Sequence, residues 1–240
     1  MIVLVLGAGP ASGELPPLLL LENDGQLLVE RLVQACDGLS ATLVFAVRLG
    51  DIAAYRIDRV IKLAAPSAEI VAINGETAGA ACTALLCIRS IRPDAELLVL
   101  SGNEFVDVDF AEIVAGFRSR RLDAGVIVFP SIHSRYAHVR LENDLVVEAS
   151  EKHPISRDAS AGFTWFCKGA DFISAAQDMI RNDAHVDGRF FISLTLNELV
   201  LRGRRIGVTA IDPRRYHPLK SLQQMNQFEI EPLVAKESWN

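Results

Sequence analysis

Residues 97–110 have the sequence LLVLSGNEFVDVDF, in which a run of leucine and valine ends at a Ser-Gly-Asn turn and acidic residues follow. A short apolar run bounded by turn residues is typical of a strand that is buried on both faces of a parallel sheet. Parallel α/β sheets bind their ligands beyond the carboxyl ends of the strands. The turn that begins at Ser101 is therefore the first candidate for a functional loop.

Similar apolar runs recur along the first half of the chain, and segments with helical periodicity separate them. We expect strands at 2–6, 41–47, 69–73, 96–100 and 125–129, and helices at 27–36, 52–64, 80–91 and 110–121. This alternation is the pattern of repeated βαβ units around a parallel sheet.

The pattern changes after Pro130, where two strand-like runs flank the turn Glu142-Asn143-Asp144 and predict a β-hairpin. This half is expected to contain strands at 136–141, 145–149, 161–167 and 205–210 and helices at 170–181, 191–201 and 220–228. The whole pattern predicts an α/β fold: a mostly parallel, mixed sheet flanked by helices, with an antiparallel hairpin added. We expect one domain over residues 1–230 and a C-terminal tail at 231–240.

Composition excludes several classes of protein. The chain has 240 residues, half of them apolar, and a net charge of −6, which makes it too hydrophobic for a disordered or fibrous protein. It has no basic stripe for a nucleic acid partner, and neither a charged leader nor a long apolar stretch for a membrane. The four cysteines form no CxxC pair and are expected to be reduced core residues. We therefore expect a cytoplasmic protein.

Two glycine-containing loops are candidates for contact with a nucleotide. The first, GAGPASG at 7–13, places Gly7 and Gly9 where bare backbone N–H groups could contact a phosphate, although it does not fit GxGxxG. The second, NGETAGAACT at 74–83, opens a helix with Gly79 and Ala80, where a flat base or ribose could approach the backbone. A glycine-rich turn with tight helix packing explains the second loop equally well.

Acidic residues follow two of the expected strands. Asp107 and Asp109 could hold Mg²⁺ against a nucleotide phosphate, although capping of the helix that begins at Phe110 is the simpler role for either one. Glu151 and Lys152 follow the hairpin, where a carboxylate could bind a sugar hydroxyl and an ammonium could bind its phosphate.

Taken together, these loops resemble the family of nucleotidyltransferases that activate sugar phosphates and related phosphates with a nucleoside triphosphate. The resemblance is most specific at 77–86, 97–110, 151–156 and 159–166, and it extends through 169–172 and 187–198. It implies the nucleotide-diphospho-sugar transferase fold, which is GT-A type and Rossmann-like. The branch that the chain looks like occurs in capsule and lipopolysaccharide gene sets.

The resemblance also implies roles for individual residues. Its nucleotide-binding positions are Gly7, Gly9, Glu76, Thr77, Gly79 and Ala80, and its positions for the sugar phosphate are Glu151, Lys152 and Gly162. Asn103 and Lys152 occupy catalytic positions, and Asn103 and Asp107 would be weak ligands for Mg²⁺. The expected partners are a nucleotide with a sugar phosphate, or a nucleotide sugar, and the hairpin and the C-terminal helix are candidate homodimer surfaces.

The chain departs from the family at its charged groups. Members begin GxGxR and continue to a Pro-Lys pair, but here the arginine position is Ala11, the lysine position is Leu18, and no Lys or Arg precedes Arg31. The metal-binding aspartate is replaced by Asn103. A Gly-Thr-Pro or Asp-Thr-Gly turn near the C-terminus is replaced by Tyr-His-Pro-Leu at 216–219, where His217 is expected in an exposed loop.

Three hypotheses follow from these departures. In the first, the chain is a nucleotidyltransferase that recruits substitutes, for example Arg31 or Lys152 for phosphate and Glu104, Asp107 or Asp109 for the metal. Alternatively, it is a catalytically degenerate paralogue that binds a nucleotide, nucleotide sugar or sugar phosphate. The third hypothesis is a glycosyltransferase of the same fold that uses Asp107-Val108-Asp109 as a DxD metal motif. Loss of the Arg, the Lys and the Asp together should leave little transfer activity by the usual route.

Overall fold

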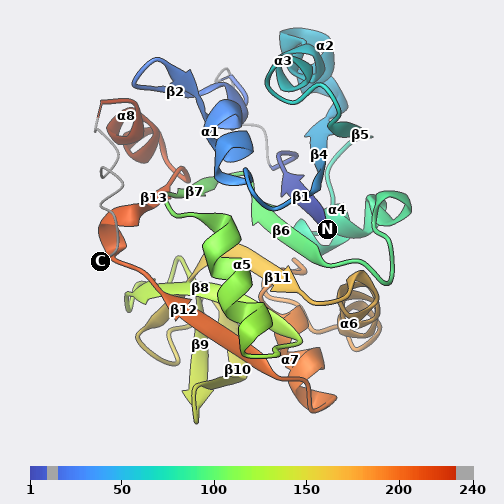
Figure 1. Ribbon diagram of the computed structural model, residues 1–240, viewed down its shortest axis with the longest axis vertical. Helices are drawn as coiled ribbons and strands as arrows, with labels where there is room; N and C mark the ends of the chain where they lie inside the picture. The colour runs from blue at the N-terminus through green and yellow to red at the C-terminus, as the bar shows by residue number, and fades with distance from the viewer. Residues whose placement is uncertain (10–15, 231–240) are drawn as a thin grey trace.

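The computed structural model describes residues 1–9 and 16–230, so the expected tail at 231–240 lies outside the described residues. A nine-stranded sheet runs through the molecule in the order β5-β4-β1-β6-β11-β8-β12-β10-β9 (Figure 1). Its strands are β1 (Ile2–Leu6), β4 (Thr42–Arg48), β5 (Glu69–Ile73), β6 (Leu97–Ser101), β8 (Ala124–Pro130), β9 (Ala137–Glu142), β10 (Leu145–Glu151), β11 (Asp158–Phe166) and β12 (Ile206–Ala210).

The first half of the sheet is parallel, as predicted. β1 lies between β4 and β6, with Leu4 opposite Val44 on one side and Val99 on the other, and β5 extends the sheet beyond β4. Every residue of β1 is buried, because helices cover both faces of a parallel sheet. The continuous apolar runs in the sequence reflect this double burial.

The second half is mixed. β11 runs antiparallel to both β6 and β8, β12 is parallel to β8, and the β9–β10 hairpin pairs antiparallel with β12. The pairing of β11 with β8 shifts register between Ser160 and Thr164. This irregularity contains Gly162, whose φ is +60°, so β11 bulges at that point.

The helices form a layer on each face. Val3 and Val5 of β1 belong to the core cluster that contains α1 (Leu28–Ala35), α3 (Ile57–Ala64), α5 (Phe110–Ser119) and α8 (Leu222–Ile230). The alternate residues Ile2 and Leu4 belong to the cluster that contains α4 (Ala80–Leu86), α6 (Gly169–Arg181) and α7 (Thr195–Leu201). Figure 1 shows α1 and α5 in front of the sheet. The expected α/β fold, with its hairpin addition, is confirmed.

Three expected helices differ from the prediction, one because it is divided and two because they end early or begin late. The helix expected at 52–64 is two helices, α2 (Leu49–Tyr55) and α3, because Arg56 adopts a left-handed conformation with φ +54°. The helix expected at 80–91 ends at Leu86 and continues as a separate 3₁₀ turn. The helix expected from 191 begins at Thr195. Strong apolar periodicity hid these breaks, since neither glycine nor proline marks them.

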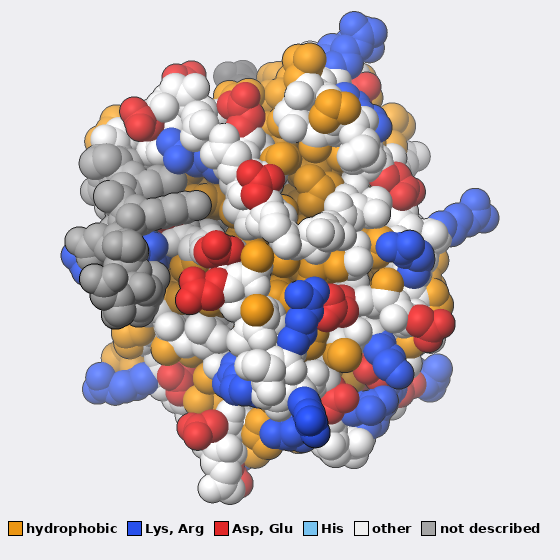
Figure 2. Space-filling view, viewed as in Figure 1, with side chains coloured by type: hydrophobic (Ala, Val, Ile, Leu, Met, Phe, Trp, Pro, Cys, Tyr) orange, Lys and Arg blue, Asp and Glu red, His pale blue; other side chains and the backbone are white. Residues whose placement is uncertain are grey.

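Apolar side chains also reach the surface near α2 and α3. Leu49, Tyr55 and Leu63 are exposed, and Figure 2 shows apolar side chains gathered between α1 and the α2–α3 pair at the top of the view. No helix within residues 1–9 and 16–230 is long and apolar enough to cross a bilayer.

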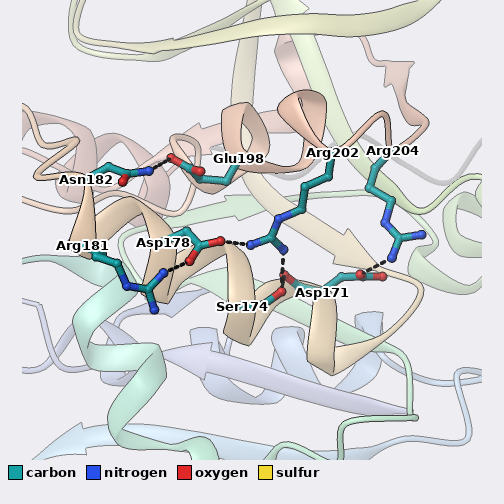
Figure 3. A network of polar contacts seen from close by, with 8 residues as sticks. All are labelled: Asp171, Ser174, Asp178, Arg181, Asn182, Glu198, Arg202 and Arg204. Carbon is teal, nitrogen blue, oxygen red and sulfur yellow. Dashed lines mark hydrogen bonds and ion pairs between the residues drawn. The ribbon is translucent and has the colours of Figure 1, made fainter.

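An ion-pair network ties α6 to α7 and to the segment before β12 (Figure 3). Asp178 of α6 pairs with Arg181 and Arg202, while Arg204 donates to Asp171 over 2.9 Å. The side-chain amide of Asn182 donates to Glu198 over 3.4 Å. The network fastens the helix layer at one end of the sheet.

Candidate functional site

The loops after β1 and β6 touch at the carboxyl edge of the sheet. The Gly102 N–H donates to the Leu6 carbonyl over 3.1 Å. A Cβ at Gly102 would lie 2.3 Å from that carbonyl oxygen and 2.9 Å from the Cα of Gly7. Only glycine permits this approach, which brings the two loops together as the parallel-sheet rule predicts.

A short pairing that the sequence did not reveal brings a distant segment to the same edge. β7 (Glu104–Val106) pairs antiparallel with β13 (Tyr216–Pro218), which places Pro218 opposite Glu104. The Leu219 N–H then donates to the Asn103 carbonyl over 2.9 Å. Two departures from the family pattern, Asn103 and the segment 216–219, therefore lie side by side.

Glu104 forms the centre of a buried polar cluster at this pairing. Its side chain is only 6% exposed, the Tyr216 hydroxyl donates to its Oε2, and the Lys220 ammonium lies 3.6 Å from the same oxygen. A Cβ at Gly162 would lie 2.3 Å from the other oxygen, Oε1. The bulge in β11 thus makes room for the Glu104 carboxylate, and the prediction that Gly162 contacts a sugar phosphate stays a prediction.

Aromatic rings form one wall of the cluster. Tyr216 stacks on Phe129 with ring centroids 4.2 Å apart, and Tyr136 meets Phe129 edge-on at 5.1 Å. The Lys220 ammonium lies over the Tyr136 ring, 5.5 Å from its centroid. Burial, followed by the negative charge of Glu104, raises the pKa of Tyr216 far above its usual range, so its hydroxyl remains a hydrogen-bond donor.

Glu151 and Lys152 lie at the end of β10, as expected. The Ser193 hydroxyl donates to Glu151 Oε2 over 2.7 Å. Burial raises the pKa of Glu151, Glu104 adds to the rise, and the Ser193 hydrogen bond, Lys220 and Lys152 oppose it. The charges of the Glu104 cluster therefore act on Glu151.

Lys152 is exposed and has a left-handed backbone, with φ +59°. Its ammonium lies 2.9 Å from Asp187 and 5.7 Å from the centre of the Phe191 ring. Side-chain exposures of 43% for Lys152 and 71% for Asp187 make this a surface pair of low energy. The prediction that Lys152 binds a phosphate stays a prediction.

The first loop is apolar where the family carries a lysine. Leu18 begins a 3₁₀ turn, Leu18–Leu20, and packs against the core. A Cβ at Gly7 would lie 2.9 Å from Leu19, whereas none of the described residues lies within 4 Å of a Cβ at Gly9. Ala11 lies outside the described residues. Arg31, a proposed substitute for the missing cations, donates instead to the Asn23 carbonyl over 2.5 Å.

The second loop packs against the chain itself. A Cβ at Gly79 would lie 2.4 Å from the carbonyl oxygen of Phe190, and the Phe190 N–H donates to Ala78 over 2.7 Å. The hydroxyls of Thr77 and Thr83 lie 2.7 Å apart. Gly79 is thus required for tight packing, which is the alternative that the sequence left open, while contact of Glu76, Thr77 or Ala80 with a base stays a prediction.

The side-chain oxygen atoms near Asn103 do not form a site that fits Mg²⁺. The Asn103 side-chain oxygen already accepts from the Ser101 hydroxyl over 2.7 Å, and Tyr216 and Lys220 engage the Glu104 carboxylate. Asp109 caps α5, accepting from the Ala111 and Glu112 N–H groups.

Within residues 1–9 and 16–230 there is no group of three His, Cys, Asp or Glu side chains that could hold a metal ion. The capping role predicted for Asp109 is confirmed, and this use of its carboxylate disfavours the DxD hypothesis. The backbone N–H of Asp107 donates to the Arg215 carbonyl over 2.8 Å, which fixes the position of this residue.

His217 corrects one expectation. It was expected in an exposed loop, but it is half-buried in β13, with its ring 6.2 Å from Phe105 and 5.8 Å from Phe228. The prediction that all four cysteines are reduced core residues holds in part: all four are free, but Cys36 and Cys87 are buried whereas Cys82 and Cys167 are only partly buried. Burial raises the pKa values of Cys36 and Cys87 to about 12 and about 11.

Comparisons with known proteins agree with this fold. No protein-family model matches the chain, and no curated protein does. Among solved structures, a nucleoside-diphosphate-sugar pyrophosphorylase from Vibrio cholerae RC9 is 22% identical, with a TM-score of 0.81 over 96% of this chain and 100% of that one.

Two other solved structures are similar over nearly their whole length. A protein assigned as a glucose-1-phosphate thymidylyltransferase from Bacillus anthracis, in complex with sucrose, is 14% identical, with a TM-score of 0.74 over 95% of this chain and 94% of that one. A UDP-glucose pyrophosphorylase complexed with UDP-glucose is 13% identical, with a TM-score of 0.75 over 95% and 96% of the two chains. The chain therefore has the fold of nucleotide-sugar pyrophosphorylases.

Proposed function

We propose that this protein binds a nucleotide sugar, or the nucleotide and sugar phosphate from which one is made, at the carboxyl edge of its sheet. It is a protein of the nucleotidyltransferase kind in which binding is retained and nucleotidyl transfer is weak or lost. The observation that carries the proposal is the position of Glu151, Lys152 and the Glu104 cluster around one end of the sheet.

Glu151 supplies the acceptor for a sugar hydroxyl. The Ser193 hydrogen bond orients one of its oxygens, which leaves acceptor capacity on the other. Asn197 holds the strand that carries Glu151, because its side chain both accepts from the Ala149 N–H over 2.7 Å and donates to the Ala149 carbonyl over 2.8 Å. A fixed carboxylate of this kind binds a neutral polyol without reorganisation.

Weak transfer follows from the missing positive charge. Phosphoryl and nucleotidyl transfer depend on charge stabilisation, and loss of one charged clamp costs on the order of 10³-fold or more in rate. The first 30 residues contain no Lys or Arg, and Leu18, at the position of the family's lysine, packs against the core. A triphosphate would therefore lack the groups that neutralise its leaving pyrophosphate.

Two measurements on the full chain test this proposal. Calorimetric titration with UDP-glucose, dTDP-glucose, glucose 1-phosphate and UDP should show saturable binding of at least one of them. A coupled assay for pyrophosphate release, with Mg²⁺, each nucleoside triphosphate and common sugar phosphates, should show little or no turnover.

The two results decide between the hypotheses. Brisk pyrophosphate release would establish a working nucleotidyltransferase and overturn the loss of transfer. Absence of binding by all four ligands would contradict the proposal itself. UDP-glucose hydrolysis that is lost in Asp107→Ala would favour the glycosyltransferase instead.

The cellular setting is part of the same proposal. Nucleotide sugars are the donors for glycosyl transfer, and we place this protein, as a binding protein for them or their precursors, in the assembly of surface polysaccharide such as capsule or lipopolysaccharide. A reducing cytoplasm suits its four free cysteines. Light scattering of the purified chain would test the homodimer for which the hairpin and α8 are candidate surfaces.

A further inference from the structure

We infer that the Lys220 ammonium is the resident cation of this site, and that a phosphate group binds beside it without a divalent metal. The inference rests on the proposed function for the kind of ligand, but it assigns a role to a residue that neither the sequence motifs nor the fold identified. It also explains why the oxygen ligands for Mg²⁺ are missing at Asn103.

The fold fixes the position of Lys220. The hydrogen bond from Leu219 to the Asn103 carbonyl joins the preceding residue to the loop after β6, and the Lys220 N–H donates to the side chain of Gln224 over 3.0 Å. Lys220 therefore projects from a braced turn beside Asn103, where the resemblance implied a metal ligand. The backbone that carries this cation is therefore already ordered before a phosphate arrives.

Charge balance supports the same role. Glu104 is a buried carboxylate, and a buried charge requires a partner of opposite sign. Lys220 lies 3.6 Å from it, and its side chain remains 29% exposed against 6% for Glu104. The ammonium therefore compensates Glu104 on its buried side while its other side remains open to a ligand.

The Lys220 ammonium has N–H groups that can donate to a ligand. Lysine carries three N–H donors, and 3.6 Å is longer than an ordinary hydrogen bond. Among the hydrogen bonds of residues 1–9 and 16–230, the Lys220 ammonium donates none. Phosphate oxygens are strong acceptors and form charge-assisted bonds with an ammonium.

The charge of Lys220 also acts on the proposed sugar site. Together with Lys152 it lowers the pKa of Glu151, against the effects of burial and Glu104. The Tyr136 ring, under the Lys220 ammonium at 5.5 Å, keeps that side of the site apolar and so strengthens the electrostatic contact.

The simpler role for Lys220 is that of a counter-ion for Glu104, and a pair of variants separates the two roles. Lys220→Met removes the ammonium but leaves Glu104 unpaired. Lys220→Met/Glu104→Gln removes both charges and keeps an acceptor for the Tyr216 hydroxyl. If Lys220 serves only Glu104, the double variant should bind ligand as the wild type does.

The experiment is calorimetric titration of the full chain with inorganic pyrophosphate, glucose 1-phosphate and UDP-glucose, each in EDTA and in MgCl₂. We expect wild-type affinity to be the same in both buffers. Lys220→Met and the double variant should each bind about 10- to 100-fold more weakly, as loss of a hydrogen bond to a charged group predicts. Lys220→Arg should retain most of the affinity, and Lys168→Met, beside α6 at the opposite edge of the sheet, should match the wild type.

Each outcome has a distinct meaning. Binding that requires Mg²⁺, or a double variant that binds like the wild type, would overturn the inference and leave the proposed function intact. Absence of binding to all three probes by the wild type would overturn both. Thermal unfolding of every variant would show whether a loss of affinity comes from a loss of folded protein.

Discussion

The Tyr216 hydroxyl donates a hydrogen bond to the Glu104 carboxylate across 112 residues of sequence. This contact links β13 to β7 and closes the candidate site at its buried end. It also means that the carboxylate nearest to Lys220 is held from two sides, by a phenol and by an ammonium.

Tyr216→Phe removes the hydroxyl and leaves the ring stacked on Phe129. The buried Glu104 carboxylate loses a hydrogen bond that nothing replaces, so the free energy of unfolding should fall by about 1–3 kcal/mol. Urea denaturation at neutral pH measures the change. Tyr55→Phe is the matched control, since Tyr55 is exposed and its substitution should change stability by less than about 0.5 kcal/mol.

Gly162→Ala tests the space that the bulge in β11 provides. The new Cβ would lie 2.3 Å from Glu104 Oε1 at a residue with φ +60°, so both collision and backbone strain should destabilise the fold. Gly203 has φ +69° and nothing within 4 Å of a Cβ, so Gly203→Ala should show the strain alone, about 1–2 kcal/mol.

The excess cost of Gly162→Ala over Gly203→Ala, read from the two urea midpoints, reports the collision with Glu104. We expect an excess of about 1–3 kcal/mol, the range for overpacking. Equal costs would mean that Glu104 moves aside freely and that the cluster is not rigid.

Glu151→Gln should weaken binding of whichever nucleotide sugar or sugar phosphate the wild type binds by about 10-fold or more, because a hydrogen bond to a charged acceptor is lost. Glu148→Gln, three residues earlier in β10 and ion-paired on the surface with Arg140, should have little effect. Isothermal titration calorimetry on both variants makes the comparison.

The raised pKa of Glu151 adds a pH signature to this binding. Protonation removes the negative acceptor, so wild-type affinity should fall as the pH drops toward the ordinary range of a glutamate, near 4.3, and the fall should begin at higher pH than for an exposed carboxyl group. Glu151→Gln should lack this dependence. If the affinities of the wild type and Glu151→Gln depend on pH in the same way, this would argue against contact between Glu151 and the ligand.

The burial of His138 leads us to expect a change of stability with pH. His138 is fully buried, and within residues 1–9 and 16–230 neither of its ring nitrogens has a hydrogen-bond partner. Burial lowers its pKa, and the charge of Asp158 opposes this effect. Because the unfolded chain then binds a proton more readily than the folded one, stability should be lost as the pH falls below about 6.5. Each unit of lowered pKa contributes about 1.4 kcal/mol.

Urea denaturation at pH 7.5 and at pH 5.5 measures this loss. His138→Gln cannot take up the proton and should lose less stability between the two pH values than the wild type does. His185→Asn removes a partly exposed histidine and should retain the wild-type pH dependence. A wild-type loss that persists in His138→Gln would assign the effect to other groups.

Much of the sheet could be predicted from the sequence because its strands are buried on both faces. The run at 2–6 coincides with β1, every residue of which is buried, since continuous Val, Ile and Leu leave few alternatives. The run at 69–73 also coincides with its strand, β5, although this edge strand is only partly buried. Arg56 shows the limit: its left-handed conformation divides α2 from α3, and a non-glycine residue in that conformation leaves no signal in hydrophobic periodicity.

The candidate site was predicted only in part. Glu151 and Lys152 were found because they directly follow a strand, and Asn103 because it follows the buried run at 97–100. The role of Lys220 depends on the pairing of two three-residue strands, β7 and β13, which are too short to show alternation. Tight packing at Gly79 depends on Phe190, more than a hundred residues away, which local sequence cannot indicate.

The position of β11 in the sheet has a consequence for how the protein unfolds. It pairs with β6 from the first half of the chain and with β8 and β9 from the second, so neither half has a complete set of hydrogen-bonded neighbours without it. A protease cut in the exposed turn at 142–144 would leave two fragments that remain bound to each other. The molecule should therefore melt in a single step, and neither fragment alone should fold or carry half of the ligand site.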